Sequence, residues 1–209
     1  GAGGAAAPTD AGPMTSPSRH DAPASAIAAR FGAEAGSDPW TGDYVAPARP
    51  APVTVSDGRG GSRRWLRPKL WGVPPPPQGT EPVTHVRNLT SPFWIGTLRH
   101  AELRCLIPAT AFAYWSGAGG ARRQHWFSVP SQPIFAFAGV VRQGEDWPCF
   151  AMLTTEANRL VAHHQPKAMP VILHAEDHAT WLSGEWRAAV ALAAPFPSQL
   201  MAVGEAPPV

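Results

Sequence analysis

Near the middle of the chain, residues 104–108 read Arg104-Cys105-Leu106-Ile107-Pro108. The apolar centre of this stretch predicts a short buried strand, and residues 111–115 (Ala-Phe-Ala-Tyr-Trp) predict a second, aromatic strand directly after it. The glycine-rich residues 117–120 predict a hairpin loop, because residues 125–129 alternate in polarity as a returning strand does. The middle of the chain is therefore a series of short β-strands.

The same pattern continues toward the C-terminus. Residues 134–141 are nearly all apolar, which predicts a strand buried on both faces, and residues 150–154 repeat this pattern. A further strand is expected at residues 171–173. Short helices are expected at residues 156–162 and 175–182.

The N-terminal half is more interrupted. Residues 24–31 predict a short amphipathic helix that ends at a glycine. Prolines interrupt residues 44–55, so we expect an edge or bulged strand there. Residues 57–62 predict a turn and residues 63–73 a strand, and residues 74–77 form a polyproline stretch. Many short strands with few short helices predict a single α+β, mainly β domain.

Length and composition set the expected organisation. A chain of 209 residues supports one sizeable domain, and 25 Pro and 20 Gly divide it into short elements. We expect a leader or tag remnant at residues 1–23, the domain at residues 24–196, and a tail at residues 197–209. The leader lacks the basic start and apolar stretch of a signal peptide. The chain also has no apolar run near the roughly 20 residues that span a bilayer. We therefore expect a cytoplasmic protein, with association with the nucleoid left open, no membrane partner and a monomeric state.

Charge and cysteine content narrow the chemistry only slightly. The formal net charge of +2, with a pI of about 8.8, permits binding of polyanions but is not a basic footprint. Cys105 and Cys149 lie in apolar runs outside any metal-binding pattern, which favours reduced core thiols. His163 and His164 are adjacent, so their side chains point apart on extended backbone, and no carboxylate-rich segment accompanies them. We expect neither a metal nor a cofactor.

The sequence contains seven short motifs: Asp43-Tyr44-Val45-Ala46-Pro47, Lys69-Leu70-Trp71-Gly72-Val73-Pro74, His85-Val86-Arg87, Ser91-Pro92-Phe93-Trp94, Arg104-Cys105-Leu106-Ile107-Pro108, Ala111-Phe112-Ala113-Tyr114-Trp115 and Pro166-Lys167-Ala168-Met169-Pro170-Val171-Ile172-Leu173. In their order and spacing, these motifs resemble the SOS-response-associated peptidase (SRAP) family. The resemblance implies a twisted, partly closed β-sheet or barrel with short peripheral helices. It also implies covalent capture of abasic sites in single-stranded DNA during the DNA-damage response.

Two of the reactive groups that this resemblance implies are replaced. The family's N-terminal cysteine falls near Met14, Thr15 and Ser16, and no cysteine precedes Cys105. The family's glutamate, its acid/base group, falls on Tyr114. A phenol has a reference pKa about 6 units above that of a glutamate. We therefore expect a divergent member that does not crosslink to DNA.

The remaining positions of the family's site are partly kept. Arg87 is retained, and its fork of donors suits a phosphate oxygen, with a salt bridge at a strand end as the alternative. His85 stands where the family has an asparagine that positions the sugar. The family's histidine falls on Gln165 without a gap or on His164 after a one-residue slip. The candidate catalytic residues are thus His85, Tyr114 and His164, each with a packed or solvated side chain as the alternative.

The candidate nucleic-acid contacts are Arg87, Trp71, Arg67 and Lys69. Aromatic rings interleaved with basic residues suit a groove for single strands, and a solvated polar face is an equal alternative. The polyproline stretch replaces a tryptophan-rich loop that stacks on bases in some family members. The expected partner is single-stranded DNA, with or without an abasic site.

Three functions follow from these residues. The first is a degenerate SRAP-like protein that associates with single-stranded DNA without covalent capture. The second is an active peptidase or lyase with a rearranged site made of His85, Tyr114 and His164. The third is a descendant of the fold that binds proteins and carries out no chemistry.

Overall fold

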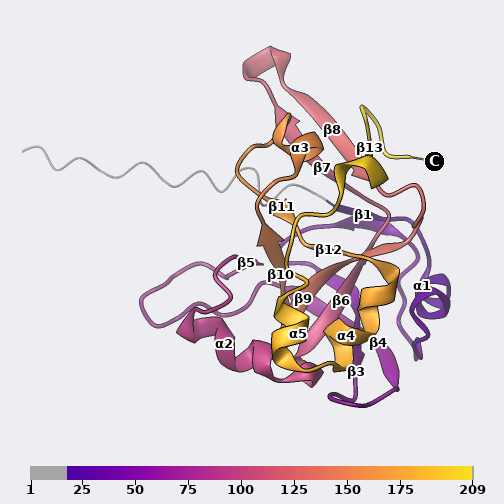
Figure 1. Cartoon of the computed structure of the whole chain (residues 1–209), viewed down its shortest axis with the longest axis vertical. Helices are drawn as coiled ribbons and strands as arrows, with labels where there is room; N and C mark the ends of the chain where they lie inside the picture. Colours follow the sequence, from indigo (N-terminus) through magenta and orange to yellow (C-terminus); the bar gives the residue numbers. More distant parts are fainter. Residues whose placement is uncertain (1–17, 209) are drawn as a thin grey trace, which may run out of the picture.

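Five strands form a closed barrel at the centre of the molecule (Figure 1). The computed structural model describes residues 18–208. The barrel strands are β3 (Pro50–Ser56), β4 (Arg64–Trp71), β6 (Arg104–Ala109), β9 (Phe135–Gln143) and β10 (Pro148–Thr155). They follow the order β10-β4-β3-β6-β9, and β9 pairs back with β10 to close the ring. The pairing of β10 with β4 is parallel and the other four are antiparallel.

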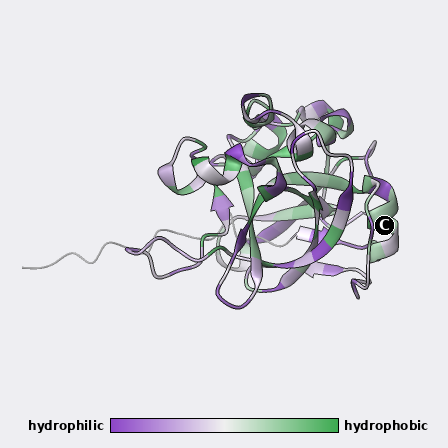
Figure 2. Cartoon of the chain, turned by 90° about the horizontal axis from the view of Figure 1, so that it is seen from below, coloured by the Kyte–Doolittle hydropathy of each residue, from purple (hydrophilic) through white to green (hydrophobic). Residues whose placement is uncertain are grey.

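The inside of the barrel is filled by side chains. Alternate residues of each strand point inward, because successive side chains of a strand face opposite ways. Ile107, Phe137 and Phe150 belong to the inner core cluster, whereas their neighbours Leu106 and Ala138 belong to an outer one. Both faces are buried, which explains the continuous apolar runs of the sequence. Figure 2 shows the corresponding concentration of hydrophobic residues along the barrel strands.

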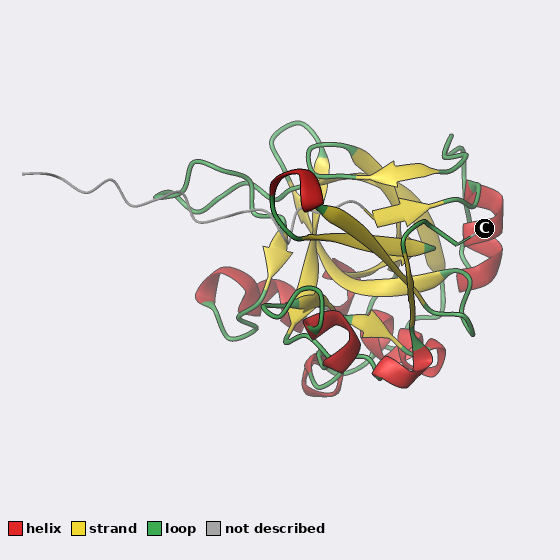
Figure 3. Cartoon of the chain, turned by 90° about the horizontal axis from the view of Figure 1, so that it is seen from above, coloured by secondary structure: helices red, strands yellow, loops and turns green. Residues whose placement is uncertain are grey.

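Four helices cover the outer face of the barrel, and Figure 3 shows them around the periphery of the strands. They are α1 (Ala24–Phe31), α2 (Pro92–Arg99), α4 (His178–Ser183) and α5 (Trp186–Val190). Each contributes apolar side chains to the outer cluster, among them Ile27, Trp94, Trp181 and Ala189. The Trp181 indole also donates a hydrogen bond to the carbonyl of Cys105 at 2.8 Å, which fixes α4 on the barrel.

A second sheet has the order β13-β8-β7-β1-β2. Its strands are β1 (Ser18–His20), β2 (Asp43–Val45), β7 (Ala111–Ser116), β8 (Arg123–Ser128) and β13 (Ala202–Gly204). The β7–β8 hairpin projects from the barrel at the top of Figure 1. Phe112, Tyr114 and Phe127 face the inner core cluster, so this sheet packs over one end of the barrel.

Short elements connect these parts. They are β5 (His85–Val86), β11 (Met169–Pro170), β12 (Ile172–Leu173), α3 (Arg159–Ala162), η2 (Ala101–Leu103), η3 (Gly119–Ala121), η4 (Ala175–Asp177) and η5 (Ser198–Leu200). β5 pairs with β10 in parallel, farther along β10 than β4 does. This places His85, one of the predicted site residues, at the end of the barrel.

The mainly β, α+β fold class is confirmed, and several details differ from expectation. Residues 50–56 do not form an edge strand, because β3 pairs with β4 throughout and with β6 at Thr54. Pro50 and Pro52 are tolerated because they lie outside the pairing with β6. The helix expected at residues 156–162 begins only at Arg159, since the Asn158 side chain caps it by accepting a hydrogen bond from the amide of Val161 at 2.9 Å.

Strands also lie outside the expected domain limits of residues 24 and 196. β1 precedes the first limit and pairs with β2 and β7, and β13 follows the second and pairs with β8. Residues 1–17, where most of the expected leader falls, are outside the described part of the chain. Between residues 18 and 208, no helix has the length and apolar character to cross a membrane.

Replacing Gly139 with alanine is expected to lower the free energy of unfolding by about 2 kcal/mol, since overpacking a filled core carries a cost of that order. A Cβ at this position would lie 2.5 Å from Ile107 Cδ1 and 2.9 Å from the carbonyl oxygen of Ala151. Urea unfolding measures the change. Gly96→Ala in α2 is the matched control: it meets open space and should stabilise the helix by about 1 kcal/mol. Equal effects of the two substitutions would contradict the packing argument.

Candidate nucleic-acid interface

Trp71 and His85 form one packed unit at the end of the barrel. Trp71 is 1% exposed and stacks on Phe150, with ring centroids 6.0 Å apart. Its indole donates a hydrogen bond to the carbonyl of Thr84 at 2.9 Å, and its ring meets His85 edge-on at 5.5 Å. A base therefore has no access to the Trp71 ring. This differs from the expected contact of Trp71 with nucleic acid: Trp71 is a core residue that holds the strand of His85 in place.

His85 is a neutral imidazole in this environment. Burial lowers the pKa of His85 to about 4, because the charged form loses solvation. Its Nδ1 lies 2.7 Å from the hydroxyl of Thr84. If that hydroxyl donates, the proton of the ring is on Nε2, and the ring then offers a hydrogen-bond donor at that nitrogen.

Arg87 follows two residues later and is exposed. β5 ends at Val86, so Arg87 lies just beyond the strand, two residues from His85 along the chain. Within residues 18–208, no ion pair or side-chain hydrogen bond engages its guanidinium. Arg87 therefore forms no strand-end salt bridge, the alternative role, with any described residue. The guanidinium is free to meet a ligand.

Arg67 and Lys69 share a face of β4 with Trp71, by the alternation of the strand. Arg67 is exposed, and among residues 18–208 its guanidinium donates only to the carbonyl of Leu66, at 3.1 Å. Lys69 is half-buried, and burial lowers the pKa of its ammonium. Arg67 is thus available to a ligand, whereas Lys69 presents only part of its side chain.

Tyr114 lies in the inner core and is 3% exposed. Its ring meets those of Phe112 and Phe127 edge-on, at 5.9 and 6.1 Å. Burial raises the pKa of the phenol above its already high ordinary value. Tyr114 therefore stays protonated near neutral pH and does not take over the acid/base work of a glutamate.

A polar set beside Tyr114 escaped the sequence analysis. His125 pairs with Tyr114 across the β7–β8 hairpin, and its Nε2 lies 2.6 Å from the hydroxyl oxygen of Ser116. The ring of His164 packs against that of His125 at 4.0 Å and against Phe127 at 5.8 Å. Ser116, His125 and His164 form this hairpin set. The available signal was the hairpin register, which places residues 114 and 125 opposite each other.

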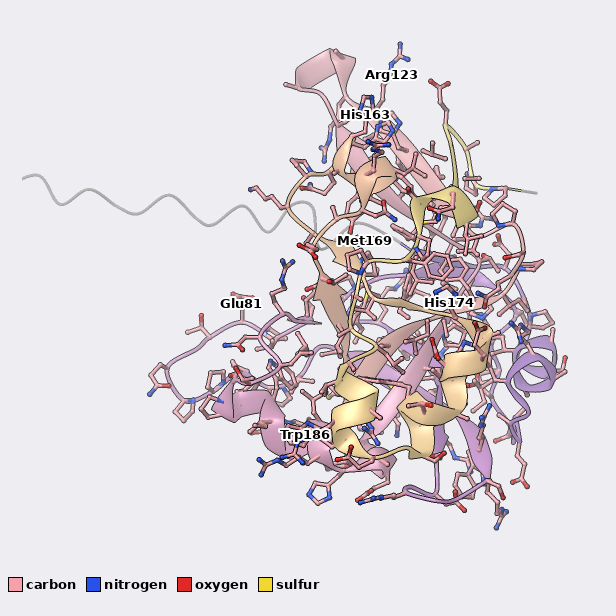
Figure 4. The ribbon with its side chains drawn as sticks, viewed as in Figure 1. Glu81, Arg123, His163, Met169, His174 and Trp186 are labelled. Atoms are coloured by element: carbon pink, nitrogen blue, oxygen red, sulfur yellow. The ribbon has the colours of Figure 1, made fainter. Side chains whose placement is uncertain are left out.

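His164 and Gln165 have different roles. His164 joins the hairpin set, and desolvation together with the charges of His125 and His163 lowers its pKa. Gln165 is buried. Its side-chain oxygen Oε1 accepts a hydrogen bond from the backbone amide of Lys167 at 3.0 Å, which stabilises the loop. His163 is exposed and lies beside the β7–β8 hairpin, at the same end of the molecule as Arg123 (Figure 4).

The expected catalytic residues are not all brought together. Tyr114 and His164 both pack against Phe127, from β7 and from the loop after α3. In the described part of the chain, neither a hydrogen bond nor a ring contact joins His85 to these two residues. His85, with Arg87 two residues beyond it in the chain, is therefore separate from the hairpin set.

The position of the family's cysteine, near Met14 to Ser16, lies outside the described residues. The first described residue, Ser18, pairs with Phe112, two positions along β7 from Tyr114. The two thiols of the chain are buried, with Cys105 0% and Cys149 4% exposed. Burial raises the pKa of both. Across residues 18–208, no three His, Cys, Asp or Glu side chains are arranged to hold a metal ion.

A similar fold occurs in bacterial proteins of known structure. A protein from Bacteroides thetaiotaomicron has 18% identity and a TM-score of 0.69 over 90% of each chain. A protein from Bordetella bronchiseptica has 17% identity and a TM-score of 0.74, over 91% of this chain and 99% of that one. A second, phage-related protein from Bordetella bronchiseptica has 16% identity and a TM-score of 0.70, over 91% of this chain and 93% of that one. These likenesses establish the fold.

The family follows from the sequence match. Residues 17–206 match the family model of the SOS response associated peptidase (SRAP), and the chain belongs to this family. Comparison with curated proteins gives no match.

Proposed function

We propose that this SRAP protein binds single-stranded DNA, including strands with abasic sites, without covalent capture, as part of the response to DNA damage. The observation that carries the proposal is the pair His85 and Arg87. An exposed guanidinium with no partner in the described chain follows a neutral imidazole two residues later in the sequence. Such a pair suits one phosphate oxygen and one sugar or base acceptor.

The absence of covalent capture rests on the groups that remain. Thiazolidine formation needs an accessible thiol on the same residue as a free α-amine. No cysteine precedes Cys105 in the sequence, and both cysteines lie in the core. The phenol of Tyr114 also stands where an ionisable carboxyl would move the proton during ring opening. Binding is therefore proposed to depend on phosphate contacts and to be reversible.

Fluorescence anisotropy with a labelled single-stranded oligonucleotide tests the proposal. The logarithm of the binding constant should fall linearly with the logarithm of the salt concentration. Its slope should be roughly −0.7 for each phosphate that the protein neutralises. A duplex of the same sequence serves as the comparison. If the oligonucleotide does not bind even at low salt, the proposal is rejected.

The hairpin set favours a second candidate, an active peptidase or lyase with a rearranged site. A serine hydroxyl at 2.6 Å from an imidazole is the arrangement of a nucleophile with its base. This candidate needs turnover of a peptide or of an abasic strand that is lost in Ser116→Ala and His125→Ala. His85→Ala and His164→Ala complete the series. If the wild-type protein shows no turnover, or the variants match it, this candidate is removed.

A further inference from the structure

A groove of about 390 Å³ lies between two loops on the side of the barrel. One wall is the loop between β4 and β5, where Gly72, Pro74, Pro75 and Pro82 line the groove. This loop extends sideways from the barrel in Figure 1, and Glu81 lies on it in Figure 4. The other wall is the tip of the β9–β10 hairpin, with Trp147.

Both walls are held rigidly. Val73 and Val83 exchange two backbone hydrogen bonds, of 2.9 and 2.8 Å, which close the base of the proline-rich loop. On the other side, the carbonyl of Trp147 accepts hydrogen bonds from the amide of Gly144 at 2.9 Å and from the thiol of Cys149 at 3.1 Å. A Cβ on Gly144 would lie 2.5 Å from that carbonyl oxygen, so the tip is tightly closed. A partner would therefore meet a groove that is already formed, which reduces the entropy cost of binding.

Trp147 is the most exposed of the large hydrophobic residues in the described chain, at 65%. The exposed Trp115 differs, since the guanidinium of Arg122 covers its ring at 4.7 Å. No cation of the described chain covers Trp147 in this way. An exposed tryptophan on a rigid support is typical of the residues that dominate binding energy at protein interfaces.

The rim of the groove is acidic. Glu145 and Asp146 line it, and Glu81 is the neighbour of Pro82 in the opposite wall. None of the three takes part in an ion pair with a described residue, and no lysine or arginine lines the groove. The carboxylates of Glu145 and Asp146, unpaired among the described residues, repel a nucleic-acid backbone and attract a cation, and Glu81 adds a third negative charge nearby.

We propose that this groove binds an extended, proline-containing segment of a partner protein that carries arginine or lysine. Prolines keep such a segment extended before binding, so that it can dock against Trp147 and the proline wall. A basic side chain of the segment stacks on Trp147 and pairs with Glu145 or Asp146. The proline-rich loop leads directly into Thr84 and His85, so a partner would be held next to the proposed DNA contact. The inference does not depend on DNA binding.

An array of labelled peptides tests this groove. Each peptide carries two prolines and two arginines, and their spacing varies from peptide to peptide. The matched set carries glutamate in place of arginine. At least one arginine peptide should bind, and Trp147→Ala should weaken it at least tenfold. The double variant Glu145→Lys and Asp146→Lys should abolish it. Trp115→Ala, at the exposed tryptophan of β7, should leave the affinity unchanged.

Three results would overturn the inference: no arginine peptide binds better than its glutamate counterpart, Trp147→Ala binds as the wild type does, or Trp115→Ala weakens binding equally. The inference would also be rejected if no peptide binds and Trp147→Ala instead weakens binding of the single-stranded oligonucleotide. Trp147→Ala should still bind the oligonucleotide. Loss of peptide binding in this variant can therefore be told apart from a failure of the proposed DNA binding.

Discussion

Arg87→Ala is expected to weaken the binding of a single-stranded oligonucleotide by about tenfold or more. A hydrogen bond to a charged group contributes about 1.5 to 3 kcal/mol, and the guanidinium has no partner among residues 18–208 that would compensate for its loss. The slope of the salt dependence should also decrease, because one phosphate contact is removed. Anisotropy titrations at several salt concentrations measure both quantities.

Arg59→Ala is the matched control for this experiment. Arg59 is exposed on the turn between β3 and β4, and its replacement removes the same charge. Arg59→Ala should change the affinity little, because it alters only the overall electrostatic field of the protein. Equal losses in Arg59→Ala and Arg87→Ala would mean that binding follows net charge and that His85 and Arg87 form no site.

Acidification from pH 7.5 to pH 5 is expected to reduce the free energy of unfolding by several kcal/mol. Burial lowers the pKa of His20, His85 and His178 to about 4, from an ordinary value of 6.5. The unfolded chain binds protons below pH 6.5, whereas the folded chain resists them until about pH 4. The stability is therefore complete above pH 6.5 and is lost as the pH falls toward 4. At pH 5 the loss is about 1 to 2 kcal/mol for each histidine.

Urea unfolding at pH 7.5, 6 and 5 checks this dependence. His178→Gln should flatten the dependence by removing one of the three groups, at some cost in stability at neutral pH. His100→Gln is the control, because His100 is exposed at 62% and is not one of the three buried imidazoles. A stability that does not change between pH 7.5 and 5 would contradict the burial of these three imidazoles.

The barrel could be predicted in outline because apolar runs mark strands buried on both faces. Residues 134–141 predicted β9 for this reason. Helix α2 was missed, since Phe93, Trp94 and Ile95 are not strong helix formers. Its signal was local: Ser91 caps the helix by accepting a hydrogen bond from the amide of Phe93, and Pro92 begins it.

The site was harder to predict, because it depends on register and burial. The sequence marks Trp71 as an aromatic residue near basic ones, and only packing against Phe150 shows that its ring is closed to a ligand. The hairpin set depends on the pairing of Tyr114 with His125. That register depends on the geometry of the turn as well as on the apolar pattern of the two strands, and residues 117–120 alone do not reveal where the pairing begins.

The most direct test of the account is incubation of the protein with an oligonucleotide that contains one abasic site, followed by a denaturing gel. The same oligonucleotide without the lesion is the control. We predict binding under native conditions and no covalent band after denaturation, because the chain offers no accessible thiol before Cys105. A strong covalent band that requires the abasic site would contradict the account.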